Sequence, residues 1–317
     1  MKPDHTVRPP PAMTVTRIGV CLSILVASGA FRAQAQYLPP FAPPNVGDAP
    51  VKISDHVWAI YGFPNIGIVV GAKGVLVVDT GLGPRNGAAA AKIAQALAPS
   101  RKLYLTTTHF HPEHAGGDAG FPKDTVLIRD RVQQRELDLH GQEMIDLFAR
   151  RNEVQKQLLA DVALRKPDVL FDAEYRLDLG GVVARLLWYG GAHTQGDEMV
   201  FVDPDKTLIS GDVVQNKVVP NIYGDGGTPA SWIEVLEKTQ RLGALHVLPD
   251  HSPASDGALV DLELKFISEL RSRALELKQA GVAEAEAGGR LTAEFKQRYS
   301  GWPISTVSGF VKSVYAE

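Results

Sequence analysis

Cysteine is almost absent from this chain, which has one, Cys21, among 317 residues. A single thiol cannot form an internal disulfide or a cysteine-rich zinc site. An excess of basic residues is also missing, because the formal net charge is -3. That balance gives no electrostatic case for nucleic-acid binding. With 44% hydrophobic and 22% charged residues, the composition is that of a globular protein and excludes a disordered or fibrous chain.

The first 35 residues have the pattern of a secretory signal peptide. A charge-free run of 14 residues, 18–31, follows Arg17 and precedes Ala33-Gln34-Ala35, which fits a small-x-small cleavage site. Such a run is too short to span a bilayer of about 30 Å as a helix. We therefore expect an exported protein, in the bacterial periplasm, with no stable membrane anchor after cleavage.

Removal of residues 1–35, whether the chain starts at Met1 or Met13, takes away its only cysteine. Any metal site in the remainder must then be built from histidine, aspartate and glutamate. Residues 36–50 hold five prolines and indicate an extended lead-in. Residues 51–317 are left as the single predicted domain.

Short β-rich runs and helical stretches alternate along this domain. The first set of predicted strands, which encloses a helix at 85–97, is 57–63, 67–71, 74–79 and 102–107. The second set, which encloses a helix at 231–242, is 175–179, 181–189, 199–203, 207–210 and 245–248. Residues 132–164 are predicted as a helical insert suited to a lid, and 257–317 as a helical C-terminal extension. The repeated order predicts one α/β domain, with two similar halves packed sheet to sheet and helices outside.

The strongest chemical feature is the run THFHPEHAGG at 108–117, directly after a predicted strand. His109 and His111 alternate along an extended chain and can point to the same side. Glu113 and His114 follow around a turn, so four ligating side chains converge from six residues. Imidazole and carboxylate are the ligands that zinc or iron uses when thiolates are unavailable.

Three further polar stretches stand at strand ends downstream, and they contain His193, Asp212 and His251. Loops at the ends of successive strands deliver ligands to one rim of a sheet. The sequence therefore offers seven candidate ligands: His109, His111, Glu113, His114, His193, Asp212 and His251.

These motifs, in this order, resemble the metallo-β-lactamase superfamily, whose signatures are HxHxDH, HTxGD, GD and GH. The matching stretches are 109–114 (HFHPEH), 193–197 (HTQGD), 211–212 (GD) and 250–251 (DH). The resemblance covers residues 51–253. It implies an αββα four-layer sandwich of the metallo-β-lactamase type with a binuclear site, and two zinc ions per chain are expected.

The family pattern also implies how the ligands are shared. It assigns three to one metal: His109, His111 and His193. It assigns three to the other, Glu113, His114 and His251, with Asp212 bridging both. Asp79 matches the family's buried aspartate, which supports the ligand loop.

The chain departs from the family pattern in two places. Glu113 stands where aspartate is usual, so it either binds the second metal differently or acts from outside the ligand set. Asp250 stands where glycine is common, a change expected to affect the loop and not the ligand.

The predicted function is a binuclear-zinc hydrolase that uses a metal-bridging hydroxide to cleave an ester, thioester, lactone or amide, β-lactams included. Metal binding lowers the pKa of water towards ~7, so no serine or cysteine nucleophile is needed. Glu113 and Asp212 are the predicted catalytic residues, and Glu113 would orient the nucleophile or shuttle a proton. Asn221 and Tyr223, in a glycine-rich loop, are the predicted substrate-binding residues. The expected partner is a small-molecule substrate, and no protein partner is indicated.

Asp212 excludes β-lactamases of the thiolate type, which place a cysteine there. A bridging aspartate is more similar to the thioesterase, lactonase and phosphodiesterase branches. The exported, glutamate-containing pattern with a helical extension also resembles bacterial quinoprotein-relay zinc metallohydrolases. The alternative function is a non-haem iron oxidoreductase of the persulfide dioxygenase type, with iron in place of zinc on the same fold.

Overall fold

The computed structural model describes Met1 and residues 46–47, 49–222 and 226–317. The chain divides into two units, Met1–Gln34 and Ala35–Glu317, and the second contains both sheets and all of the described helices. Apart from Met1, the predicted signal peptide lies outside the described residues, as does most of the predicted lead-in. In the part of the chain that is described, no helix has the length and apolar character needed to cross a membrane.

One sheet has seven strands, in the spatial order β1-β2-β3-β4-β5-β6-β7. Their bounds are Val51–Lys52, Val57–Ile60, Ile66–Val70, Gly74–Val78, Lys102–Thr106, Val126–Asp130 and Val169–Phe171. The strands from β1 to β4 pair antiparallel, and those from β4 to β7 pair parallel. Parallel pairing needs crossover connections, and helix α1 (Pro84–Leu97) is the first of these.

The other sheet has six strands, in the order β13-β12-β11-β10-β9-β8. From β8 to β13 their bounds are Glu174–Asp178, Val183–Trp188, Glu198–Val202, Thr207–Gly211, His246–Pro249 and Ser255–Asp256. Among the described residues of this sheet, β11 and β12 are the only parallel pair, and α5 (Pro229–Gln240) connects them.

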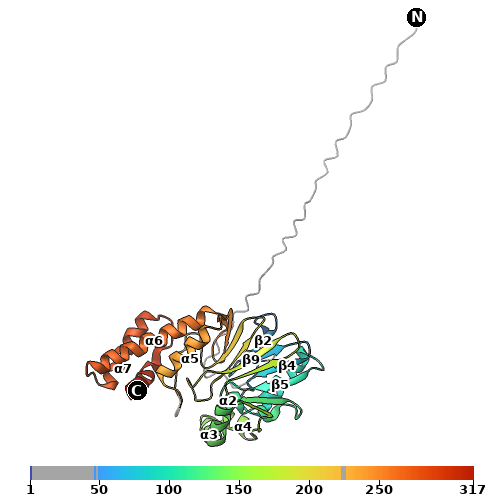
Figure 1. Ribbon diagram of the computed structural model, residues 1–317, viewed down its shortest axis with the longest axis horizontal. Helices are drawn as coiled ribbons and strands as arrows, with labels where there is room; N and C mark the ends of the chain where they lie inside the picture. Colours follow the sequence, from blue (N-terminus) through green and yellow to red (C-terminus); the bar gives the residue numbers. More distant parts are fainter. Residues whose placement is uncertain (2–45, 48, 223–225) are drawn as a thin grey trace. The chain divides into compact units, whose positions relative to one another are not determined.

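Apolar side chains from the inner faces of both sheets form one buried core, which includes Leu76 and Val78 of β4 and Val200 and Val202 of β10. On the outer face of the first sheet, the small side chains of α1 lie close to the strands. The outer face of the second sheet is covered by α5 and by α6 (Ala258–Gln279), and two further helices of the C-terminal region, α7 (Glu284–Arg298) and α8 (Val307–Ala316), pack against α6. In Figure 1 the labelled helices α5, α6 and α7 lie side by side. The predicted αββα sandwich with a helical C-terminal extension is confirmed.

Two helices follow β6, where one helical insert was expected. They are α3 (Arg131–Ala149) and α4 (Glu153–Leu159), and α3 lies beside the short α2 (Pro112–Ala115) (Figure 1). Asp130 caps α3 by accepting hydrogen bonds from the backbone N–H groups of Val132 and Gln133. Asn152 caps α4 in the same way. The second cap divides the stretch, because a capping residue has non-helical backbone angles.

Candidate metal centre

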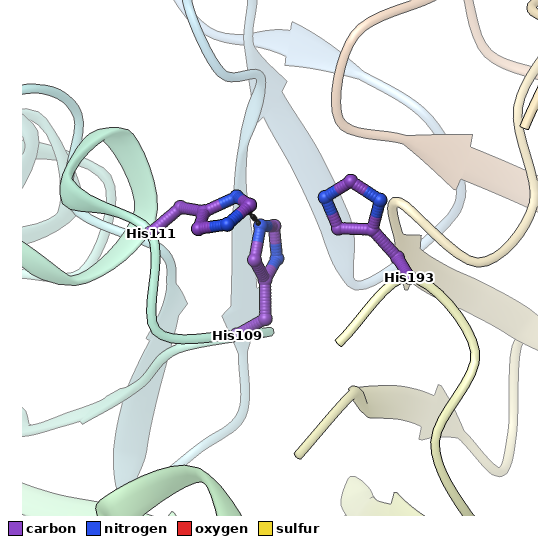
Figure 2. Close-up of side chains that lie close together, drawn as sticks. All are labelled: His109, His111 and His193. Carbon is purple, nitrogen blue, oxygen red and sulfur yellow. Dashed lines mark hydrogen bonds between the residues drawn. The ribbon is translucent and has the colours of Figure 1, made fainter. Parts of the chain in front are cut away.

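The loop after β5 brings two imidazoles into direct contact. The Nε2 atom of His109 lies 3.0 Å from the Nδ1 atom of His111. Figure 2 marks this contact with a dashed line. His111 is extended, with φ -63° and ψ 149°, and α2 begins at the next residue. That short helix contains Glu113 and His114. The predicted convergence of four side chains from one loop is therefore present in the structure.

The second sheet faces this loop with one candidate ligand from each of three connections. His193, between β9 and β10, points towards the pair in Figure 2, and the ligand atoms of His109, His111 and His193 lie within 4.8 Å of one another. A second group within that distance is formed by Glu113, His114 and His251. The Nε2 atoms of His114 and His251 are 3.2 Å apart.

Asp212 lies between these two groups. Its Oδ2 atom is 3.3 Å from Nε2 of His193, and its Oδ1 atom is 3.5 Å from Nε2 of His251. Burial disfavours its charge, but the His251 and His193 imidazoles outweigh that effect and lower the pKa of Asp212. All seven predicted ligands therefore meet in one place.

Charge and burial at this place suit a cation. Burial, with a smaller contribution from neighbouring imidazoles, holds the pKa values of His109 and His111 well below the usual range. Burial also lowers the pKa of His251 to about 4. Neutral imidazoles offer lone pairs, and nitrogen atoms as close as those of His109 and His111 need either a shared proton or a cation between them.

The surroundings of Glu113 test whether these residues fit a bound cation. Its Oε2 atom is buried and has no hydrogen-bond partner among the described residues. Burial raises the pKa of Glu113 to about 7. A buried carboxylate oxygen without a donor is costly, and a bound cation removes that cost. Five imidazoles and two carboxylates are a donor set that fits zinc or iron.

A buried network behind His114 supports the first loop. Asp79 accepts a hydrogen bond from the backbone N–H of Thr108 at 2.7 Å, and its Oδ2 atom is 3.2 Å from Nδ1 of His114. The backbone of Asp79 has φ 72°, a conformation that costs on the order of 1–3 kcal/mol for a residue with a side chain. The predicted supporting role of Asp79 is confirmed by these contacts.

Asp250 belongs to the same network, so the expectation that it affects only its own loop is wrong. Its Oδ2 atom is 3.3 Å from Nδ1 of His114 and accepts a hydrogen bond from Oγ1 of Thr108 at 3.0 Å. Burial and the neighbouring Asp79 carboxylate raise the pKa of Asp250 well above its usual range. Sequence reasoning also missed Thr108, whose hydroxyl joins Asp79, Asp250 and the loop.

Two ligands of the second sheet, His193 and Asp212, are each held by a hydrogen bond. Nδ1 of His193 donates to the backbone carbonyl of Asn221 at 2.6 Å, which leaves Nε2 of His193 as its ligand atom. Nε2 of Gln215 donates to Oδ1 of Asp212 at 2.5 Å. Neither support was predicted from the sequence. Asn221 supports His193 through its backbone carbonyl, and this contact does not test the predicted role of Asn221 in substrate binding. Tyr223 lies outside the described residues.

Close contact between the two halves depends on Gly211, the residue before Asp212. Gly211 has φ 56°, and a Cβ atom there would lie 2.8 Å from Cβ of Thr108. Any side chain at this position would push the end of β11 away from the first loop.

An apolar wall stands beside the centre. The Phe63 ring centroid lies 4.8 Å from that of His251, and the Phe148 ring centroid lies 6.2 Å from that of His111. Phe148 belongs to a buried cluster drawn mainly from α3 and α4, with Ile145, Leu158 and Leu159. The helical insert therefore reaches the candidate site.

The sequence model of the metallo-beta-lactamase superfamily matches residues 59–252, a segment that contains all seven candidate ligands. The chain belongs to this superfamily. Members of the superfamily are mostly metal-dependent hydrolases, and the donor groups described above fit that general chemistry.

Solved structures of other superfamily members share the fold at low identity. A metallo-beta-lactamase from Pontibacter korlensis is 21% identical with a TM-score of 0.56, and the match covers 69% of this chain and 98% of that one. A metallo-beta-lactamase from Hirschia baltica is 16% identical with a TM-score of 0.55, with 70% and 98% covered. An inverting sec-alkylsulfatase from Pseudomonas sp. is 16% identical with a TM-score of 0.63.

The fraction of each chain that the match covers differs between these relatives. The alkylsulfatase match covers 85% of this chain but only 50% of that protein. The two β-lactamases are almost fully matched, yet they leave close to a third of this chain unmatched. At these identities the likeness shows the fold alone.

Proposed function

We propose that this superfamily member is a binuclear zinc hydrolase that cleaves an ester, thioester, lactone or amide, β-lactams included. The observation that carries the proposal is the pair of donor groups, His109/His111/His193 and Glu113/His114/His251, with Asp212 between them. We further propose that the protein is exported to the bacterial periplasm and acts there on a small-molecule substrate.

When bound, two zinc ions would supply a hydroxide at neutral pH and polarise the carbonyl oxygen next to the bond that is cleaved. The residues of the chain position these groups and move protons. Asp212 is held by Gln215 in an orientation that presents both of its oxygens to histidines. The carbonyl of Asn221 fixes the tautomer of His193.

Glu113 is proposed as the proton carrier. A carboxylate at this position can orient the attacking water or accept its proton. Asn221 and Tyr223 are proposed to contact the substrate from the loop that follows Asp212.

Elemental analysis of the purified protein tests the metal and the reaction class. We expect about two zinc ions per chain and hydrolysis of at least one compound in a panel of lactones, thioesters, β-lactams and phosphodiesters. A sulfate ester belongs in that panel because one similar structure is an alkylsulfatase. One iron per chain, together with oxygen consumption on a persulfide, would overturn the proposal.

Replacement of Glu113 by aspartate tests its place in the second group. The shorter side chain restores the usual residue of the family, so Glu113→Asp should keep or raise zinc occupancy at the second site. Zinc content and turnover are measured together. Loss of both metals in this variant would contradict the assignment of Glu113.

A further inference from the structure

Arg151 lies in the short turn between α3 and α4, beside the candidate site. Its guanidinium carbon is 3.4 Å from the ring centroid of Phe148. Phe148 is buried, with 1% of its surface exposed, and its ring is the one that neighbours His111. A guanidinium over a ring face at this distance is held by a cation–π interaction, so the buried Phe148 ring positions this cation.

The charge of Arg151 acts on the candidate site. Burial is the main cause that lowers the pKa of His111, and the Arg151 charge lowers it further. Burial is also the main cause that raises the pKa of Glu113, and there the Arg151 charge opposes the effect of burial. Yet the Arg151 side chain is exposed and makes no ion pair or side-chain hydrogen bond with any residue in the described ranges. Its N–H donors are therefore available at the edge of the site.

A guanidinium with available donors binds a carboxylate through two parallel hydrogen bonds. Phe63, which is partly exposed, packs against the same cluster as Phe148 and lies beside His251, so apolar surface adjoins the histidines. A ligand that fits both features has a short apolar segment that ends in a carboxylate. We propose that Arg151 binds a carboxylate group at the end of the substrate remote from the cleaved bond. This inference rests on the proposed function, because it names the class of substrate for that site.

The test uses zinc-loaded protein and two 4-nitrophenyl esters of equal chain length, the glutarate monoester and the pentanoate. They differ only in the terminal carboxylate. Arg151→Gln should lower kcat/KM for the glutarate ester by about 10–100-fold, mainly through KM, and change the value for the pentanoate ester by less than about 3-fold. Arg151→Lys should retain part of the preference, because it keeps the charge and loses the planar fork.

Arg150→Gln is the matched control, since Arg150 is the adjacent exposed arginine and its removal changes the net charge equally. It should leave the ratio between the two esters as it is in the parent protein. An equal loss on both esters in Arg151→Gln, or an unchanged ratio, would overturn the inference and would indicate that Arg151 only supports Phe148.

Calorimetric binding of glutarate and pentanoate separates this inference from the proposed function. If the parent protein hydrolyses neither ester but binds glutarate at least 10-fold more tightly than Arg151→Gln does, the inference stands and ester hydrolysis fails. If both esters are hydrolysed and glutarate binds both proteins equally, the proposed function stands and the inference is wrong. If the parent protein neither hydrolyses the esters nor prefers glutarate, the inference is also wrong.

Discussion

The loop after β5 carries four candidate ligands within six residues, whereas the second sheet supplies His193, Asp212 and His251 from three separate connections. The supports differ in the same way. One buried network, formed by Asp79, Thr108 and Asp250, lies behind the loop. On the other side, His193 is supported by the backbone carbonyl of Asn221, and Gln215 contacts both Asp212 and the backbone N–H of His251. Damage to the network should therefore affect the ligands of the loop together, whereas loss of Gln215 should affect only Asp212 and His251.

Removal of a candidate ligand from the loop after β5 is expected to have the largest effect. His111→Ala should abolish metal binding and lower turnover by at least about 1,000-fold, because the imidazole is part of the donor set that activates water. Zinc content and turnover check this result. His140→Ala is the control, since His140 is a half-exposed histidine on α3 outside the site. Retained activity in His111→Ala would refute the whole assignment.

A change in the network should have the next largest effect. Asp79→Asn keeps the shape but weakens the acceptor for Thr108 and His114, so zinc affinity should fall about 10–100-fold at both sites. Gln215→Leu is the matched change on the second sheet and should lower affinity by less than about 10-fold. Competition with a zinc chelator measures both. Equal effects of the two changes would remove the distinction drawn between the halves.

The smallest effect is expected on the stability of the fold, from a residue of the seven-stranded sheet. Burial is the main cause that raises the pKa of Asp130 to about 7, from 3.8 when exposed. A raised folded pKa means that the contribution of this group is complete below pH ~4 and is lost as the pH rises through ~7. Asparagine also caps helices, so Asp130→Asn should be more stable than the parent at pH 8, by on the order of 1–2 kcal/mol, but not at pH 4.

Urea unfolding at the two pH values measures this difference, with both proteins in the same metal state. Asn152→Asp offers a comparison at the cap of α4, where the residue is exposed. It should show no such gain at pH 8. A pH-independent difference between Asp130→Asn and the parent would contradict the burial of a titrating carboxyl.

The sequence indicated which seven side chains come together, because their spacing is local or follows strand ends. It did not predict β6 and β7. The strand β6 ends in Arg129 and Asp130, which are charged and fully buried, so the apolar pattern of a buried strand is broken. Burial of Arg129 depends on Asp118, 3.6 Å away, and no periodic pattern indicates that pairing.

Asp250 shows the same limit at the site itself. It stands next to His251 in the sequence, yet its contacts are with Thr108 and His114, and the first of these is 142 residues away. A sequence motif gives information about residues that are close together along the chain. The partner of a buried carboxyl is set by the packing of two sheets, which only the structure shows.

The division of the ligands between the two sheets also bears on how the chain holds together. His114 and His251 are 137 residues apart in the sequence but 3.2 Å apart in space, and no cysteine follows Cys21. A metal held by both would act as a cross-link that closes a long loop. By analogy with a disulfide across about 100 residues, such a closure is worth on the order of 4–5 kcal/mol. Chelators should therefore promote unfolding and proteolysis as well as inactivation.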